Sequence, residues 1–262
     1  AAELAVSASP GVELLPDLSR SRGLSSTPIS SDRPPPAGIA GRPVFSYRSY
    51  LPEPVFAAER TILAQEIDAE ITTELSLDGR LFEATQTIDY SVRFQPLDRI
   101  AFEVPNGWSI VDGEVEVVSL STGGSSGTSE APHQRLAVPI ASELGKNEDE
   151  RHTVEVALPQ PRLGRFRARL RYQLTRAADV PSTGSVELSL PAPSEVQIGT
   201  NRVRLLGPRS AAATLDPTVE QSEWQTVAAD ATKAGRSTEL VASGRQPTLP
   251  LLLQPIARDL PQ

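Results

Sequence analysis

The sequence predicts an all-β protein built as an antiparallel β-sandwich with a Pro/Ser-rich N-terminal arm. Apolar and polar residues alternate in roughly ten short segments, which is the pattern of half-buried strands. Turn residues such as Asp78-Gly79 separate these segments, and helical periodicity is nearly absent. Many short strands with few helices are typical of a sandwich, either one elaborated unit or two in tandem.

The first residues lack any strand or helix period. Residues 1–42 are rich in serine, proline and glycine and contain Arg33-Pro34-Pro35-Pro36. Because such composition favours an extended backbone, we expect an arm or linker here. We place the β-sandwich at residues 43–208. Residues 209–262 form a less regular C-terminal segment, whose one or two strands are expected to complete the sandwich.

The best-defined element is a hairpin. In residues 67–77 the apolar side chains share one parity and the polar ones take the other, and residues 80–94 repeat this pattern. Asp78-Gly79 between them predicts a type I′ turn. A two-residue turn pairs Leu75 with Phe82, so both apolar rows fall on one face and the register is well specified.

Later strands follow the same pattern. Several end in an apolar residue followed by proline, such as Leu158-Pro159, and proline cannot donate to a β-ladder. Asp216-Pro217 predicts the N-cap and first turn of a short helix through Trp224. The further strands are predicted at residues 100–104, 114–120, 135–138, 153–158, 165–174, 185–190, 195–206, 239–242 and 248–253.

Composition excludes several functional classes. The absence of cysteine removes disulfides, thiolate metal sites and cysteine nucleophiles. A net charge of −8 disfavours a general nucleic-acid binder. No apolar run approaches the roughly 20 residues of a membrane helix, so we expect no membrane insertion within this chain. Methionine is also absent, and Ala1 is therefore expected to begin a processed chain or a fragment.

Sequence signatures of catalysis are weak. Residues 123–127 satisfy G-x-S-x-G around Ser125, but that motif requires a strand, a strained turn and a helix, whereas this segment is a low-complexity loop. His133 and His152 are the only histidines, and they lack zinc-site spacing. The acidic residues within 143–150 lack the pattern of an EF-hand loop. We expect neither a metal nor a cofactor.

Carboxylates and tryptophans offer two further candidate sites. Glu74, Glu83 and Asp89 are best explained as the polar face of a sheet, although paired carboxylates of a glycosidase-type hydrolase remain an alternative. Trp108 and Trp224 are candidate binding residues, as stacking platforms for a sugar. Because aromatic residues make up only 5% of the chain, we favour a role for Trp108 at the edge of the core.

Four alternating arginines form the most unusual local feature. Their same-face spacing on a strand gives a row about 20 Å long. Such a row suits an acidic glycan or an acidic protein segment. The simpler alternative is that carboxylates such as Glu155 and Glu187 on neighbouring strands neutralise it. The row consists of Arg165, Arg167, Arg169 and Arg171.

These observations favour a non-catalytic structural or protein–protein interaction module. Its partner would be another protein or other segments of its own parent protein. The alternative is a module that recognises an acidic glycan or an acidic partner through the arginine row. In sequence style the chain resembles the β-rich extracytoplasmic segments of bacterial envelope proteins, and this resemblance implies a location in the periplasm or at the cell surface.

Overall fold

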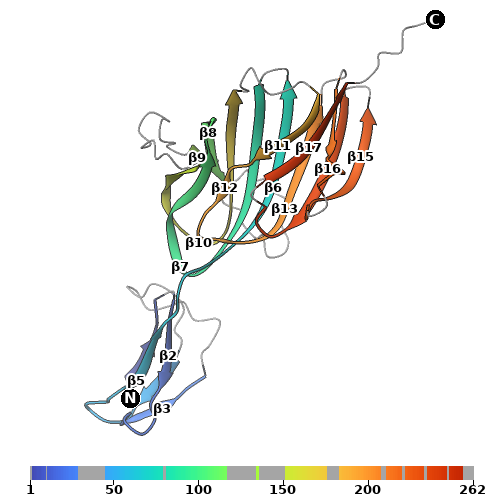
Figure 1. Ribbon diagram of the computed structural model, residues 1–262. Helices are drawn as coiled ribbons and strands as arrows, with labels where there is room; N and C mark the ends of the chain where they lie inside the picture. Colours follow the sequence, from blue (N-terminus) through green and yellow to red (C-terminus); the bar gives the residue numbers. More distant parts are fainter. Residues whose placement is uncertain are drawn as a thin grey trace, which may run out of the picture. The chain divides into compact units, whose positions relative to one another are not determined.

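The protein is an all-β molecule of two compact units (Figure 1). The computed structural model describes residues 2–9, 11–28, 45–78, 81–116, 134–135, 151–175, 183–207, 211–219, 222–232, 235–246 and 248–255. Every regular element in these ranges is a strand, which confirms the predicted fold class. Unit 1 comprises Ala1–Glu66 and Arg93–Pro96, and unit 2 comprises Ile67–Val92 and Leu97–Gln262.

Unit 1 is a small β-structure with two sheets. One sheet has the order β1-β4-β3, and in the other β2 pairs with β5, all antiparallel. Tyr47 is buried, and its ring lies 5.4 Å from that of Phe56. Its strands are β1 (Ala2–Val6), β2 (Val12–Pro16), β3 (Leu24–Ser26), β4 (Phe45–Ser49) and β5 (Ala58–Ile62).

Strands β1, β2 and β3 occupy the segment that we expected to be an extended arm. Each is three to five residues long, which is too short for a clear period of two. Their partners β4 and β5 lie further along the chain, beyond residue 44. Local sequence therefore gives little sign of these strands, because their hydrogen bonds depend on distant segments.

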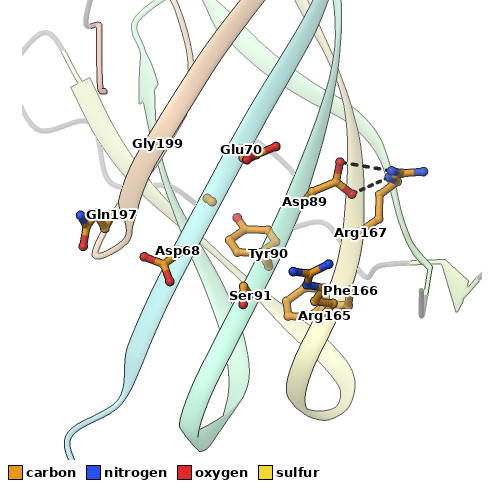
Figure 2. A pocket seen from close by; sticks show the side chains of 11 residues that line it. Asp68, Glu70, Asp89, Tyr90, Ser91, Arg165, Phe166, Arg167, Gln197 and Gly199 are labelled. Atoms are coloured by element: carbon orange, nitrogen blue, oxygen red, sulfur yellow. Dashed lines mark hydrogen bonds and ion pairs between the residues drawn. The ribbon is translucent and has the colours of Figure 1, made fainter. Parts of the chain in front are cut away.

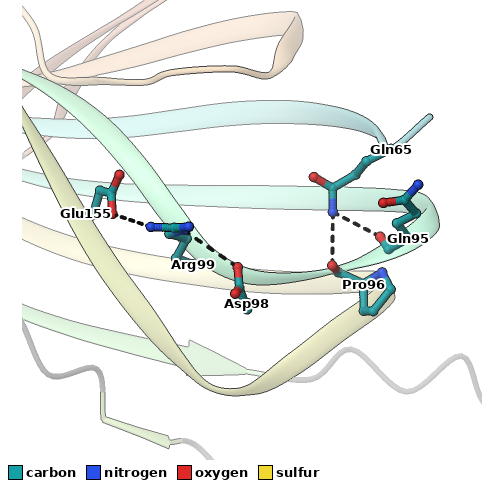
Figure 3. Close-up of polar contacts among 6 residues, drawn as sticks. All are labelled: Gln65, Gln95, Pro96, Asp98, Arg99 and Glu155. Atoms are coloured by element: carbon teal, nitrogen blue, oxygen red, sulfur yellow. Dashed lines mark hydrogen bonds and ion pairs between the residues drawn. The ribbon is translucent and has the colours of Figure 1, made fainter.

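A four-residue tip from the middle of strand β7 belongs to unit 1. Gln65 Nε2 donates to the carbonyl oxygens of Gln95 at 3.1 Å and Pro96 at 3.0 Å (Figure 3). Gln95 Nε2 donates in return to the Leu63 carbonyl at 2.8 Å. The backbone carbonyl of Phe94 also lies close to Gly11. A Cβ atom added at Gly11 would be 2.5 Å from the Phe94 oxygen. These contacts hold residues 93–96 in place.

Unit 2 holds the larger sheets. The nine-stranded sheet has the order β15-β16-β13-β6-β7-β10-β8-β9, with β12 beside β7, and the three-stranded sheet has the order β11-β17-β14. Strands β13 and β6 pair in parallel. The pairings of β10 with β7 and β8, β8 with β9, β12 with β7, β16 with β13 and β15, and β17 with β11 and β14 are antiparallel. The strands are β6 (Glu66–Asp78), β7 (Leu81–Pro105), β8 (Trp108–Glu116), β9 (Gln134–Arg135), β10 (Arg151–Thr175), β11 (Gly184–Ser189), β12 (Ala192–Pro193), β13 (Gln197–Gly207), β14 (Ala211–Leu215), β15 (Gln225–Thr232), β16 (Gly235–Ser243) and β17 (Thr248–Pro255).

One hydrophobic core joins both sheets of unit 2 in a sandwich-like arrangement. Ile88 and Phe166 from the nine-stranded sheet are fully buried in the same cluster as Leu249 and Leu251 from the three-stranded sheet. On β7 every even-numbered residue from Phe82 to Val92 is buried, as the alternation predicted. Strands β6 and β7 are neighbours, as the hairpin prediction requires, while its turn residue Gly79 lies outside the described residues.

Each strand predicted from residue 67 onward overlaps an observed strand, but several other expectations are wrong. The described part of residues 209–262 contains four strands, β14 to β17, in place of the one or two expected. Strand β10 continues through Leu158-Pro159-Gln160-Pro161, where only its register with β7 breaks, between Ala157 and Arg162. Prolines remove ladder donors, yet a bulge absorbs that loss without ending the strand. Asp216-Pro217 begins a turn in place of the predicted helix, and β15 starts at Gln225. An Asp-Pro pair occurs both in turns and at the start of helices, so the pair alone does not distinguish the two.

Candidate functional site

The arginine row lies along β10 on the face of the nine-stranded sheet opposite to the core. All four of its side chains are exposed. The residues between them, Phe166, Ala168 and Leu170, are fully buried. This alternation follows from the two-residue period of an extended strand. The four side chains on the exposed face of β10 are those of Arg165, Arg167, Arg169 and Arg171.

Carboxylates on the two neighbouring strands face this row. On β8, Glu116 lies opposite Arg167 and Glu114 opposite Arg169, while Asp112 lies opposite the fourth arginine of the row. On β7, Asp89 lies opposite Arg167. Cross-strand pairs of opposite charge stabilise a sheet. The register therefore surrounds the positive row with negative charge, which weakens its attraction for a polyanion.

Two of the four arginines form ion pairs within the sheet. Arg167 makes a two-pronged contact with Asp89, with Nε 2.7 Å from Oδ1 and Nη2 3.2 Å from Oδ2 (Figure 2). This hydrogen bonding raises the pKa of Arg167. Arg169 Nη1 lies 3.6 Å from Glu114 Oε1. Arg165 and Arg171 have no ion pair within the part of the chain that the structure describes.

The carboxylates expected to neutralise the row lie elsewhere. Glu155 is in the earlier part of β10 and pairs with Arg99 at 2.9 Å (Figure 3). Glu187 is on β11 and lies opposite Pro250 in the three-stranded sheet. Neutralisation itself occurs, but through β7 and β8, because the spatial neighbours of β10 are not the strands next to it in sequence.

A pocket of about 440 Å³ opens beside the lower end of the row (Figure 2). Its walls carry carboxylates of Asp68, Glu70 and Asp89 and the guanidinium groups of Arg165 and Arg167. Asp89 pairs with Arg167, and Asp68 also has a contact within the protein. Among the described lining residues, Glu70 and Arg165 therefore offer the remaining charges of opposite sign. Among the described residues no group of His, Cys, Asp and Glu side chains is arranged to hold a metal ion.

Tyr90 also lines this pocket, and its hydroxyl is buried without a hydrogen-bond partner among the residues that the structure describes. Its ring stacks on Phe166 with centroids 4.9 Å apart and an interplanar angle of 16°. Burial raises the pKa of the Tyr90 hydroxyl far above its ordinary value. The nearby Tyr172 differs, because its hydroxyl donates to Gln86 Oε1 at 3.3 Å.

Both candidate tryptophans belong to the interior, so neither offers a face to a sugar. Trp108 is 4% exposed, and its Nε1 donates to the Ser189 carbonyl at 2.8 Å. Trp224 is 3% exposed, and its Nε1 donates to the Thr248 carbonyl at 2.9 Å. Indole groups bury large apolar areas when their N–H finds an internal acceptor. Trp108 and Trp224 are therefore core residues and do not serve as stacking platforms for a sugar.

The candidate acids of the first hairpin each contact a polar group on an adjacent strand. Glu74 lies 3.8 Å from Arg204, and Glu83 accepts a hydrogen bond from Gln173 at 3.1 Å. This arrangement is that of a polar sheet face. The G-x-S-x-G segment with Ser125, His133 and the acidic residues within 143–150 lie outside the described residues.

Sequence reasoning missed a concentration of exposed apolar side chains on unit 1. Among the described residues ten large hydrophobic side chains are exposed, and six of them belong to this unit. The four in unit 2 lie on separate elements. The six are Leu15, Leu18, Tyr50, Leu51, Val55 and Ile62.

Comparisons with known proteins add no assignment. The sequence matches no protein-family model and no curated protein sequence. Among solved structures, a protein from Parabacteroides distasonis described as a "putative protease" aligns with a TM-score of 0.37 and 8% identity. The alignment covers 72% of this chain, which spans 40% of that protein's chain. Similarity at this level supports no argument about function.

The described residues contain no helix with the length and apolar character needed to cross a bilayer.

Proposed function

We propose that this chain is a non-catalytic module that binds a protein partner through unit 1. The proposal rests on the uneven distribution of exposed apolar side chains. Of the ten large ones among the described residues, six lie on unit 1, which holds about a quarter of the chain. Scattered exposed apolar residues are normal on any protein, whereas their concentration marks interaction surfaces. We extend the proposal to an extracytoplasmic location in the bacterial cell envelope, on the resemblance of sequence style alone.

The polar face of unit 2 suits a scaffold better than a reaction centre. Its carboxylates and arginines pair across strands, as with Asp89 and Arg167. A general acid or a nucleophile needs a perturbed pKa near a substrate cleft. The carboxylates Asp17 and Asp216 have pKa values that hydrogen bonds lower, and each sits in a turn that it stabilises.

A selection experiment tests the proposal. The full chain is immobilised and screened against a random-peptide display library, and selected peptides are synthesised and titrated by calorimetry. We expect saturable binding that competes between selected peptides. A parallel panel of polysaccharide, ester and peptide substrates supplies the opposing outcome. Turnover that one carboxylate substitution abolishes, or a failure to select any saturable binder, would overturn the proposal.

A second candidate is recognition of an acidic ligand by the arginine row. It is favoured by Arg165 and Arg171, for which the described residues supply no ion pair, and disfavoured by the carboxylates around them. Polygalacturonate is the probe, because it is an acidic glycan without protein-like side chains. Arg165→Ala with Arg171→Ala is expected to weaken salt-sensitive binding more than Arg167→Ala, whose guanidinium is already paired. Equal effects would contradict this candidate.

A further inference from the structure

The pocket beside the arginine row has two walls of opposite charge. All of its lining residues belong to unit 2. Strand β6 contributes the carboxylates of Asp68 and Glu70, and β10 contributes the guanidinium groups of Arg165 and Arg167. Strand β7 lies between β6 and β10 in the sheet. One wall of the pocket is therefore acidic and the opposite wall is basic (Figure 2).

Small residues in the lining help to keep this pocket open. Ser91 of β7 and Gly199 of β13 both line it. A Cβ atom added at Gly199 would meet no atom within 4 Å apart from its chain neighbours. The register of β13 with β6 also shifts between Ile198 and Asn201, and such irregularities are frequent next to active sites. The volume of about 440 Å³ lies in the range of small-molecule sites.

Two of the lining charges are left for a ligand. Asp89 holds Arg167 in the two-pronged contact, and Asp68 has a contact within the protein. Glu70 lies beside the register shift of β13, and Arg165 lies opposite an uncharged residue of β7. Neither of these two forms an ion pair with any residue that the structure describes. Each wall therefore offers one charged group to a ligand.

The separation of these two groups indicates the length of the ligand. Neighbouring strands are about 4.8 Å apart, so the backbones of β6 and β10 lie about 10 Å apart across β7. Glu70 and Arg165 also lie at different heights along their strands (Figure 2). Two charge-assisted hydrogen bonds of about 2.8 Å take up part of this distance. An extended peptide adds about 3.3–3.6 Å per residue, so two or three residues span the remainder.

We infer that this pocket binds a short peptide with free termini, its ammonium group at Glu70 and its carboxylate at Arg165. Ser91 and Gln197 supply neutral hydrogen-bonding groups for the peptide bond of the ligand. A zwitterion meets a group of opposite charge on both walls, whereas a ligand of a single charge meets one wall of its own sign. The site belongs to unit 2 and is separate from the protein-binding role proposed for unit 1.

Blocked peptides test the two charges on the full chain. Glycine, diglycine and triglycine form a length series, while N-acetyl-diglycine lacks the ammonium group and diglycinamide lacks the carboxylate. Binding is measured at millimolar peptide by calorimetry and by backbone amide shifts. We expect the two peptides to bind more tightly than glycine and to shift amides of β6 and β10. Each blocked form is expected to bind about five- to tenfold more weakly than diglycine, as for the loss of one charged hydrogen bond.

Substitutions on the two walls match each terminus to its residue. In Glu70→Gln, diglycine and N-acetyl-diglycine are expected to bind equally, and in Arg165→Gln, diglycine and diglycinamide are expected to bind equally. Gly199→Leu fills the pocket and is expected to weaken binding of every peptide. The matched controls Glu74→Gln on β6 and Arg171→Gln on β10 lie outside the pocket lining and are expected to leave affinity unchanged. All five positions are exposed, so an unchanged Tm verifies that each variant folds.

Four results would overturn the inference. Equal binding of free and blocked diglycine would mean that the termini do not contact the walls. Peptide binding that survives Gly199→Leu would place the ligand elsewhere on the chain. Tighter binding of a neutral disaccharide would make a sugar the occupant, and a lack of binding by every peptide would leave the pocket without this ligand. Library peptides that bind unit 1 are expected not to compete with diglycine, so this site and the proposed function can fail separately.

Discussion

Two buried tyrosines of unit 2 can each be replaced by phenylalanine, and the two replacements are expected to change the free energy of unfolding in opposite directions. Tyr90 is 2% exposed and Tyr172 is 1% exposed, and both belong to the same core cluster. Within the described ranges the Tyr90 hydroxyl has no hydrogen-bond partner, whereas the Tyr172 hydroxyl donates to Gln86. Replacement by phenylalanine removes the same single oxygen at each position. The difference in outcome therefore isolates the hydrogen bond.

The magnitudes follow from the cost of burying polar groups. A buried hydroxyl without a partner costs about 1–3 kcal/mol, so Tyr90→Phe is expected to raise the free energy of unfolding by that amount. Tyr172→Phe removes a bond worth about 0.5–1.5 kcal/mol and leaves Gln86 Oε1 unpaired, so it is expected to lower the same quantity by about 1–3 kcal/mol. For a domain of this size each kcal/mol shifts Tm by about 2–4 °C.

Denaturant unfolding, followed by the fluorescence of the two tryptophans in unit 2, measures both variants. A change in midpoint at constant slope reports a change in stability. Alkaline pH adds a second readout. Burial raises the pKa of Tyr90, so the unfolded chain loses this proton first, and the stability present below about pH 10 declines as pH rises further. Tyr90→Phe is expected to reduce that decline. Equal destabilisation by both substitutions would refute the reasoning, because it would mean that Tyr90 has a partner.

Three further predictions concern a turn, a backbone contact and the indole groups. Hydrogen bonds from Ser185 and Thr218 lower the pKa of Asp216, so its contribution to stability is present above about pH 4 and is lost as pH falls through the folded-state pKa. Asp216→Asn is expected to lower Tm at neutral pH and to reduce its change between neutral and acid conditions, and an unchanged acid profile would contradict this. Gly11→Ala is expected to destabilise unit 1 by about 1–3 kcal/mol or more, because φ is +78° and the new Cβ would meet the Phe94 oxygen; hydrogen exchange of the unit 1 amides measures this, with Gly199→Ala as the control in open space. Tryptophan fluorescence is expected to resist acrylamide and to ignore added polysaccharides, whereas a sugar-dependent shift would show an accessible indole.

Much of unit 2 could be predicted from sequence because its strands carry their own pattern. The alternation through Leu75 and Phe82 defines which face is buried without knowledge of the neighbouring strand. Strand order is different, since it depends on contacts that no local pattern encodes. For this reason the arginine row was predicted as an exposed row, but its actual counter-charges, Asp89 and Glu114, were not identified.

The remaining errors have local physical causes. Proline removes one ladder donor, and whether the strand then ends or bulges depends on what its flanks pair with, as the bulge at Pro159 illustrates. Trp224 showed no pattern that distinguishes an exposed platform from a core residue, because a single aromatic residue has no period. The strands of unit 1 depend on hydrogen bonds to β4 and β5, so composition alone suggested an arm.

The tip at residues 93–96 determines when unit 1 can complete its contacts during synthesis. Gln65 donates to carbonyls that lie 30 and 31 positions further along the chain, with β6 and the first part of β7 between them. A nascent chain that ends at residue 66 therefore contains most of unit 1 but not the carbonyls that Gln65 requires. Domains usually fold from the N-terminus as they leave the ribosome. The contacts between Gln65 and the tip can therefore form only after part of unit 2 has been synthesised, so unit 1 is completed after the start of unit 2 has emerged.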